Sequence, residues 1–175
     1  MITVITGPMF AGKSSKLIEI YSNKYNTNKI QAFKPSKDIR DKTYIKCRQY
    51  LTQIEAKVVK NYQDILNNIN LEKKVIMIDE AQFIEGDPRI LLDLSLIYNY
   101  EIYVAGLALD SEQNPFGSFP NLMALADKIE YVESDCYYCG RKAIYTRYIG
   151  EKSSQIKVGS NGYIPVCKHC LKEEI

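Results

Sequence analysis

Eight consecutive residues near the N-terminus, Gly7–Ser14, follow the pattern G-x-x-x-x-G-K-[ST], which is typical of loops that bind nucleotide phosphates. The apolar segment Ile2–Thr6 precedes them, and apolar residues at helical spacing follow over Lys13–Tyr25, so the pattern has its required strand–loop–helix context. The glycines let backbone N–H groups point at phosphate oxygens, and the helix N-terminus adds a favourable dipole. We expect Lys13 to reach the β- and γ-phosphates and the Ser14 hydroxyl to bind Mg²⁺. A chance glycine-rich turn is the alternative.

Two adjacent carboxylates, Asp79 and Glu80, follow the continuous apolar run Val75–Ile78. Such a run is typical of a central strand in a parallel sheet, whose C-terminal end lies beside a phosphate loop. We interpret Asp79 as the acid on the Mg²⁺ side, acting through water, and Glu80 as the group that takes a proton from the nucleophile. A solvated acidic pair at a strand end is the alternative, and the phosphate loop in the same chain disfavours it.

Four of the five cysteines form two C-x-x-C pairs, Cys136 with Cys139 and Cys167 with Cys170. Together the pairs supply the four thiolates of a tetrahedral zinc site, and four protein ligands leave no open position, so we expect the zinc to be structural. His169 lies between two of these ligands and is interpreted as a bystander. Redox-active pairs are the alternative, but redox C-x-x-C motifs usually occur singly.

The character of the sequence changes near Glu133. Before this residue, apolar segments with strand or helix spacing alternate, whereas after it Cys, Tyr, Gly and polar residues dominate. We therefore predict a nucleotide-binding α/β domain over residues 1–133 and a zinc-binding module over residues 134–175. The segment Gly140–Val166 between the cysteine pairs is unusually long, and we expect it to close over a ligand. A plain zinc-ribbon hairpin is the alternative.

The elements that must position these groups are visible as apolar patterns. Strands are expected over Ile2–Thr6, Ile30–Phe33, Ala56–Val59, Val75–Ile78, Ile102–Ala105 and Ile129–Val132. Helices are expected over Lys13–Tyr25, Asp64–Ile69, Pro88–Tyr98 and Asn121–Ala126, and residues 36–55 are expected to form a loop with at most one short helix. Alternating strands and helices favour an α/β fold with a parallel, doubly wound sheet flanked by helices.

Composition and charge limit the classes of function. The 175 residues are 46% hydrophobic, which argues against a disordered chain, and 23 basic against 21 acidic residues leave no electrostatic footprint for long nucleic acid. The N-terminus lacks a basic region before a long apolar run, and no stretch approaches the about 20 apolar residues of a membrane span. We expect a cytoplasmic protein without nucleic-acid or membrane partners. Nothing in the sequence assigns a role to Cys47.

The order of several segments resembles the thymidine kinase family found in many bacteria, poxviruses and animal cytosol. These segments are GPMFAGKSS at residues 7–15, KPSKDIR at 34–40, DEAQF at 79–83, PFG at 115–117 and the two cysteine pairs. The resemblance spans nearly the whole chain. It implies an enzyme that transfers the γ-phosphate of ATP to the 5′-hydroxyl of thymidine, and also of deoxyuridine, in deoxynucleotide salvage. It further implies Mg²⁺ with the ATP, structural Zn²⁺, a homotetramer, and inhibition by thymidine triphosphate.

The resemblance also implies roles for individual residues. Glu80 matches the catalytic base, while Lys13 and Arg40 match the groups that stabilise the transferring phosphoryl group. ATP and Mg²⁺ contacts are implied for Gly7, Pro8, Met9, Phe10, Ala11, Gly12, Lys13, Ser14, Ser15, Asp38, Asp79, Glu80 and Gln82. Thymidine contacts are implied for Met9, Phe83, Leu109, Phe116, Thr146, Val158, Gly159 and Tyr163.

Two departures from the family pattern lie on the side of the nucleoside base. Ser111 stands where many bacterial relatives have an aromatic residue, and residues 159–163, reading GSNGY, are one residue shorter than the usual G-G-x-x-K-Y. We expect both to affect substrate affinity rather than reaction type. Two rival functions are an ATP-driven nucleic-acid-binding module, disfavoured by the near-neutral charge, and a degenerate kinase that only senses nucleotide. The intact Lys13, Ser14 and Glu80 argue against the second.

Overall fold

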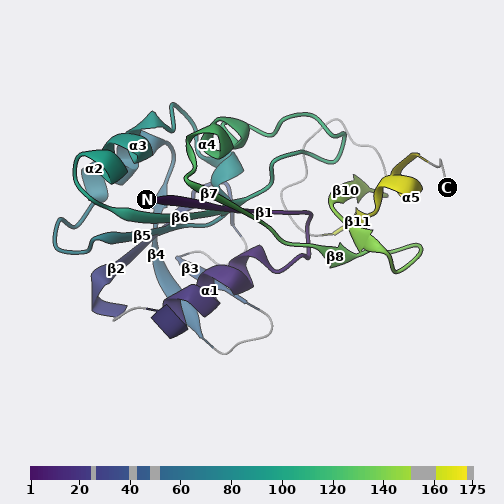
Figure 1. The fold of residues 1–175 in the computed structure, drawn as a ribbon, viewed down its shortest axis with the longest axis horizontal. Helices are drawn as coiled ribbons and strands as arrows, with labels where there is room; N and C mark the ends of the chain where they lie inside the picture. The colour runs from purple at the N-terminus through teal and green to yellow at the C-terminus, as the bar shows by residue number, and fades with distance from the viewer. Residues whose placement is uncertain (25–26, 40–42, 48–51, 151–160, 173–175) are drawn as a thin grey trace.

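A seven-stranded, mostly parallel sheet forms the centre of the computed structural model, which describes residues 1–24, 27–39, 43–47, 52–150 and 161–172 (Figure 1). The strand order is β3-β4-β2-β5-β6-β1-β7, and each neighbouring pair is parallel except β3 with β4. The strands of this sheet are β1 (Ile2–Thr6), β2 (Ile30–Pro35), β3 (Tyr44–Lys46), β4 (Gln53–Val59), β5 (Val75–Ile78), β6 (Glu101–Gly106) and β7 (Lys128–Tyr131).

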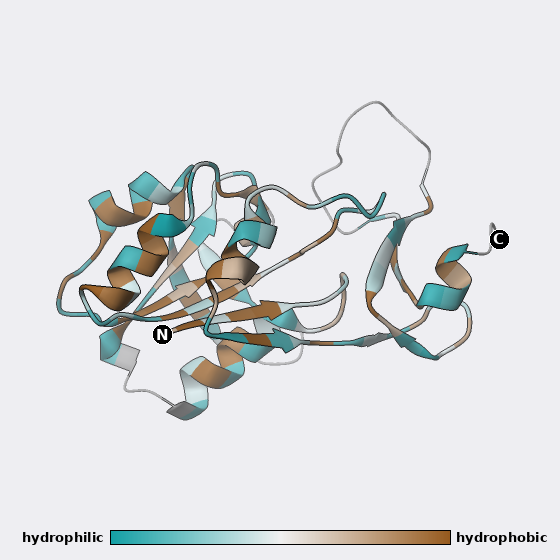
Figure 2. Ribbon diagram, turned by 45° about the horizontal axis from the view of Figure 1, so that its top comes forward, coloured by the Kyte–Doolittle hydropathy of each residue, from teal (hydrophilic) through white to brown (hydrophobic). Residues whose placement is uncertain are grey.

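Helices cover both faces of this sheet. They are α1 (Lys13–Lys24), α2 (Tyr62–Asn68), α3 (Arg89–Leu96) and α4 (Phe119–Leu125), with short 3₁₀ helices η1 (Thr27–Lys29) and η2 (Ala81–Phe83). Leu17 and Ile18 of α1 belong to the core on one face, whereas Leu91 of α3 and Leu122 of α4 belong to the core on the other. Figure 2 shows the apolar strands enclosed between these helices, so the predicted α/β class is confirmed. Among the described helices, none combines the length and apolar character needed to cross a bilayer.

The central strands β1 and β5 are buried along their whole length because helices shield the sheet on both sides. Every residue of β1 and of β5 is buried, as their continuous apolar runs predicted. Local signals fix where α2 begins: the Asn61 side chain accepts a hydrogen bond from Asp64 N at 2.9 Å, and Asp64 Oδ2 accepts from Asn61 N at 3.3 Å. This reciprocal capping satisfies two backbone donors that the first helical turn leaves unpaired.

One stretch of the fold differs from its prediction. Residues 36–55 were expected to form a loop, but Tyr44–Lys46 form strand β3, which pairs antiparallel with β4 from Gln53 onward. Ile45 is 2% exposed and joins the core under α1, so tertiary packing stabilises a strand too short to show a period of two. The other predicted elements of the large sheet and its helices lie within two residues of their expected ends, apart from the earlier start of β4.

The C-terminal part has two small antiparallel sheets. In one, β8 (Ser134–Asp135) pairs with β9 (Lys142–Ala143); in the other, β10 (Tyr145–Tyr148) pairs with β11 (Tyr163–Val166), which α5 (Lys168–Lys172) follows. These elements surround a third core that includes three of the four paired cysteines, Cys136, Cys167 and Cys170. Figure 1 places this part beyond the C-terminal ends of the parallel strands. Strands β10 and β11 lie in the segment between the cysteine pairs, and residues 151–160 in the middle of this segment, which was expected to close over a ligand, lie outside the described residues.

Candidate active site and cysteine cluster

The glycine-rich loop, residues 7–14, runs from the end of β1 into the first turn of α1. A Cβ at Gly7 would lie 2.0 Å from the Val132 carbonyl oxygen, and the residue has φ +151°, so a side chain does not fit there. Lys13 is 8% exposed, and its ammonium donates to the carbonyl oxygens of Pro8 at 2.7 Å and Gly7 at 3.2 Å. The loop therefore holds a buried cation at the N-terminal end of α1.

Asp79 lies directly after β5 and beside this first helical turn. Ser14 Oγ donates to Asp79 Oδ2 at 2.7 Å, and Asp79 is only 7% exposed. The backbone N–H of Asp79 donates to Phe33 O at 3.1 Å, which continues the pairing of β5 with β2. The structure thus brings together the hydroxyl and the carboxylate that the sequence assigned to Mg²⁺, and oxygen atoms of this kind are the ligands that Mg²⁺ prefers.

Glu80 occupies a backbone conformation that is uncommon for a residue with a side chain. Its φ is +52°, in the left-handed region between β5 and η2. Its carboxylate Oε2 accepts a hydrogen bond from Gln82 Nε2 at 2.6 Å. Gln82, assigned from the sequence to ATP and Mg²⁺, is 3% exposed, and its Oε1 accepts from Leu107 N at 3.0 Å. The Gln82 side chain therefore connects Glu80 to the end of β6.

Asp38 follows the end of β2 and forms a buried ion pair that the sequence did not predict. The Lys34 ammonium lies 3.1 Å from Asp38 Oδ2, and the two side chains are 2% and 7% exposed. Lys34 Nζ also donates to the Tyr44 carbonyl at 3.3 Å. The available signal was a lysine within the apolar run of β2, where a charge is rarely tolerated without a partner. Arg40, predicted to act with Asp38, lies outside the described residues.

Aromatic rings expected to wall the nucleoside base come together beyond β5 and β6. Phe83 of η2 and Phe116 pack edge to face, with centroids 5.3 Å apart and an interplanar angle of 82°. Leu109 is half-buried on the same segment as Phe116. A Cβ at Gly117 would lie 2.3 Å from the Gln82 carbonyl oxygen, so this glycine permits the close approach of that segment to η2.

A cavity of about 690 Å³ adjoins this aromatic pair. Lys37 and Glu85 line its other side and form an exposed ion pair of 2.7 Å, in which the Lys37 ammonium holds the pKa of Glu85 below its ordinary value. The lining includes neither Glu80 nor the glycine-rich loop. The cavity therefore lies behind the aromatic pair rather than over the reactive groups.

Thr146 of β10 connects the C-terminal part to two segments of the α/β part. It is 5% exposed, and its Oγ1 accepts a hydrogen bond from Met9 N of the glycine-rich loop at 2.9 Å. Its carbonyl accepts from Gln113 Nε2 at 3.1 Å, and Gln113 belongs to the turn between Leu109 and Phe116. Three of the residues assigned to the substrate, Met9, Leu109 and Thr146, therefore belong to segments that these two bonds join.

Tyr163 of β11 stands opposite Tyr148 of β10, and their rings lie 4.8 Å apart. Gly162 has φ +83°, and a Cβ there would lie 2.7 Å from the Tyr148 ring, so a glycine is required beside this pair. Val158 and Gly159, which were also assigned to the substrate, lie outside the described residues.

The four paired cysteines form one cluster. The Sγ atoms of Cys136, Cys139, Cys167 and Cys170 all lie within 4.8 Å of one another, and none forms a disulfide. Cys139 Sγ is 3.7 Å from Cys167 Sγ. A Zn–S bond of about 2.3 Å places tetrahedral ligands about 3.8 Å apart, so this spacing fits one zinc ion held by four sulfurs.

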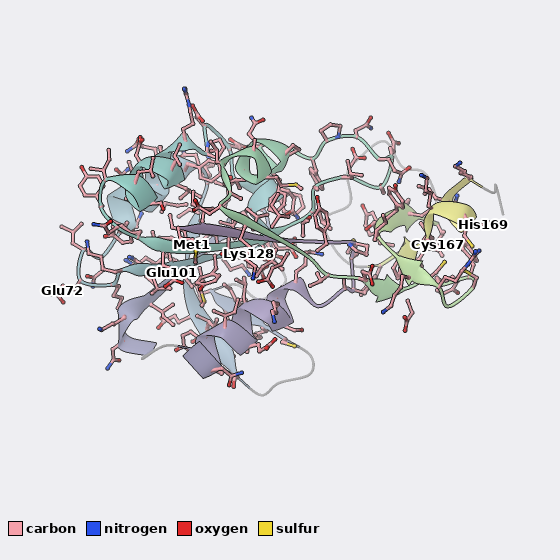
Figure 3. The ribbon with its side chains drawn as sticks, viewed as in Figure 1. Met1, Glu72, Glu101, Lys128, Cys167 and His169 are labelled. Atoms are coloured by element: carbon pink, nitrogen blue, oxygen red, sulfur yellow. The ribbon has the colours of Figure 1, made fainter. Side chains whose placement is uncertain are left out.

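Surrounding groups act differently on the thiols of this cluster. Arg141 Nε donates to Cys139 Sγ at 3.3 Å, which lowers the pKa of Cys139 to about 6 and favours the thiolate that binds metal. Burial, together with the neighbouring thiols, raises the pKa of Cys170 to about 12, so this thiol must release its proton when a metal binds. His169 is exposed and is not part of the cluster; Figure 3 labels it with Cys167.

Comparison with known proteins finds similarity over nearly the whole chain. A family model described as thymidine kinase matches residues 1–171. The thymidine kinase of Onion yellows phytoplasma (strain OY-M) is 38% identical over 184 residues, covering 98% of this chain and 88% of that protein. The thymidine kinase of Aster yellows witches'-broom phytoplasma (strain AYWB) is 36% identical over 183 residues, with the same two coverages.

Proposed function

Because this chain belongs to the thymidine kinase family, we propose that it transfers the γ-phosphate of ATP to the 5′-hydroxyl of thymidine at the C-terminal ends of β1, β2 and β5. Family membership and both relatives support phosphorylation of thymidine. The observation that carries the assignment of the site is the Ser14–Asp79 hydrogen bond. It joins the glycine-rich loop to the carboxylates after β5, so that donor phosphates and an acid–base group meet at one edge of the sheet.

On the donor side, backbone N–H groups of the glycine-rich loop and the Lys13 ammonium bind the phosphates of ATP. The Ser14 hydroxyl and, through water, Asp79 would hold Mg²⁺, which supplies positive charge against the phosphate oxygens. Arg40 acts with Lys13 on the charge of the transferring phosphoryl group. Lys13 is suited to this role because the loop already holds its ammonium inward at the start of α1.

On the acceptor side, Glu80 is the general base. The 5′-oxygen of the nucleoside forms a bond to the γ-phosphorus, the bond from that phosphorus to the β,γ-bridging oxygen breaks, and ADP leaves. The proton of the 5′-hydroxyl passes to the Glu80 carboxylate. The position of Glu80 next to Asp79, whose Oδ1 accepts the Glu80 N–H at 3.0 Å, supports this division of labour between neighbouring carboxylates.

The base pocket is formed by apolar walls and by polar groups at the edge of the base. Met9, Phe83, Leu109 and Phe116 would supply the walls, and their exclusion of water prevents transfer of phosphate to a water molecule. Thr146, Val158, Gly159 and Tyr163 would bind the thymine edge, and a mismatched edge would leave buried polar groups unpaired. Deoxyuridine, which lacks only a methyl group, is accepted with a loss of about 1–3 kcal/mol.

We further propose that Zn²⁺ at the four cysteines is structural and holds β10 and β11 in place. We also propose, from the family resemblance, that the protein forms a homotetramer, that thymidine triphosphate inhibits it and that it is located in the cytoplasm. A reducing compartment suits the cysteine cluster, because its thiols must stay unoxidised to bind metal.

A panel of nucleosides with ATP and Mg²⁺, scored for monophosphate formation, tests the function. Thymidine should be the best acceptor, and Glu80→Gln should lower kcat about 10²–10⁴-fold, the usual loss for a general base. Glu85→Gln is the matched control, because Glu85 lies near η2 but is 59% exposed and pairs with Lys37. ATP turnover stimulated by single-stranded DNA instead of thymidine would support the rival nucleic-acid module and refute the proposal.

A further inference from the structure

The side-chain amide of Gln82 has only one orientation that satisfies its neighbours. An amide has a donor end and an acceptor end, and the two ends here face different partners. Leu107 N is a donor, so the atom 3.0 Å from it must be Oε1, which leaves the NH₂ group 2.6 Å from Glu80 Oε2. The flipped amide would place two donors together at Leu107 and two acceptors together at Glu80. Gln82 therefore donates to the Glu80 carboxylate.

Two glycines create the space that this glutamine occupies. A Cβ at Gly106, the last residue of β6, would lie 2.7 Å from Gln82 Oε1 and 2.4 Å from Phe119 Cε2. Phe119 is fully buried, so its ring has no room to yield. Gly117 admits the backbone of Gln82 in the same way, since a Cβ there would meet the Gln82 carbonyl at 2.3 Å. Gln82 is thus confined at its amide by Gly106 and at its backbone by Gly117, and the residue is 3% exposed.

Glu80 benefits from such a fixed donor. Its side chain has several rotatable bonds, and ordering a glutamate side chain costs conformational entropy. A donor that is itself anchored to β6 selects one arrangement of the carboxylate before substrate binds. The loss of freedom then accompanies folding and does not recur at each turnover, and correct placement of a reacting group is a large part of catalysis.

We infer that Gln82 is a positioning residue for the base: its amide, anchored by Leu107 N–H and accommodated by Gly106, sets the plane of the Glu80 carboxylate. The inference rests on the proposed function, in which Glu80 accepts the proton. It departs from the sequence-based assignment of Gln82 to ATP and Mg²⁺, because the amide donates to the Glu80 carboxylate and accepts from the backbone N–H of Leu107, directly after β6.

A double-mutant cycle tests the inference with the full-length protein, ATP–Mg²⁺ and thymidine. Gln82→Met keeps the length of the side chain and removes both hydrogen bonds. It should lower kcat about 10–100-fold, the scale of loss that a misplacement of about 1 Å produces, with KM for thymidine and ATP changed less than about three-fold. In the Glu80→Gln background the same substitution should have almost no further effect, because residues that act as one unit are non-additive.

A second variant separates positioning from simple structural support. Gln82→Glu keeps the acceptor for Leu107 N–H but replaces the amide donor that faces Glu80 with a second acceptor. It should therefore lower kcat at least as far as Gln82→Met does although the contact to Leu107 is retained, an effect that a packing role does not produce. Melting temperatures of all variants identify any loss caused by unfolding.

The outcomes are distinguishable from those of the proposed function. Equal losses from Gln82→Met in both backgrounds, or near-normal kcat in Gln82→Glu, would overturn the inference while leaving Glu80 as the base. Near-normal kcat in Glu80→Gln alone would instead refute the proposed base.

Discussion

Replacing Lys34 by methionine isolates the contribution of the buried ion pair to stability. Methionine has a similar length, so the substitution removes the charge without opening a large cavity. The Asp38 carboxylate, which is 7% exposed, would then lose the ammonium that lies 3.1 Å away. A carboxylate in such a place cannot regain its hydration without local unfolding, and this is the source of the expected loss.

The burial of both Lys34 and Asp38 determines how much stability the Lys34→Met substitution should remove. Removing one partner of a buried ion pair costs about 3–5 kcal/mol, a large share of the about 5–15 kcal/mol that stabilises a typical domain. In a chain of this length each kcal/mol shifts Tm by about 2–4 °C, so Lys34→Met should lower Tm by about 6–20 °C. Lys37→Met is the matched control: its ion pair with Glu85 is shorter, at 2.7 Å, but the two side chains are 55% and 59% exposed. Water screens that pair, and Tm should hardly change.

Thermal unfolding followed by circular dichroism measures both variants against the wild type. Lys34→Met combined with Asp38→Asn should recover at least half of the lost Tm, because the double variant removes both charges of this pair. If Lys34→Met lowers Tm no more than Lys37→Met does, the pair makes no special contribution and the reasoning from burial is wrong.

Three further changes test other parts of the structure. Gly106→Ala should lower Tm by about 2–12 °C, because overpacking against Phe119 costs about 1–3 kcal/mol; an unchanged Tm by calorimetry would mean that the ring can move. Cys167→Ser should abolish the one Zn²⁺ expected per chain and destabilise the C-terminal part, whereas elemental analysis that finds no zinc in active wild-type protein would contradict the proposed site. Ser111→Phe should lower KM for thymidine a few-fold, since an aromatic contact is worth about 0.5–1.5 kcal/mol; steady-state kinetics with an unchanged or higher KM would show that another group already fills the space.

The parts of the fold that were predicted correctly depend on local signals. The glycine-rich loop is a contiguous pattern, and the apolar run of β5 carries its carboxylates at one end, so their meeting follows from the rule that parallel strands share a C-terminal edge. The spacing of the cysteine pairs likewise predicts a cluster, and the structure confirms that the four sulfurs lie together.

The parts that were missed depend on contacts between distant segments. Strand β3 forms because Ile45 reaches the core under α1, and no feature of three residues reveals this in advance. Leu107, the backbone partner of the Gln82 amide directly after β6, is 25 positions away in sequence, and this contact could be placed only once the register of the sheet was known. Lys34 is recognisable as a lysine within a predicted strand, but the sequence does not indicate which acidic residue it pairs with.

The position of Thr146 has a practical consequence for altering substrate range by mutagenesis. Its hydroxyl accepts from the glycine-rich loop at Met9, and its carbonyl accepts from Gln113 on the base side. A substitution at Thr146 that changes the pocket would therefore also disturb the glycine-rich loop, which is proposed to bind the phosphates of ATP. Variants selected at Thr146 for a new nucleoside should then have a lower kcat. Leu109, which the proposed function places at the base, has no hydrogen bond to Met9 within the described part of the chain, so libraries directed at this position are expected to change the acceptor with less effect on the glycine-rich loop.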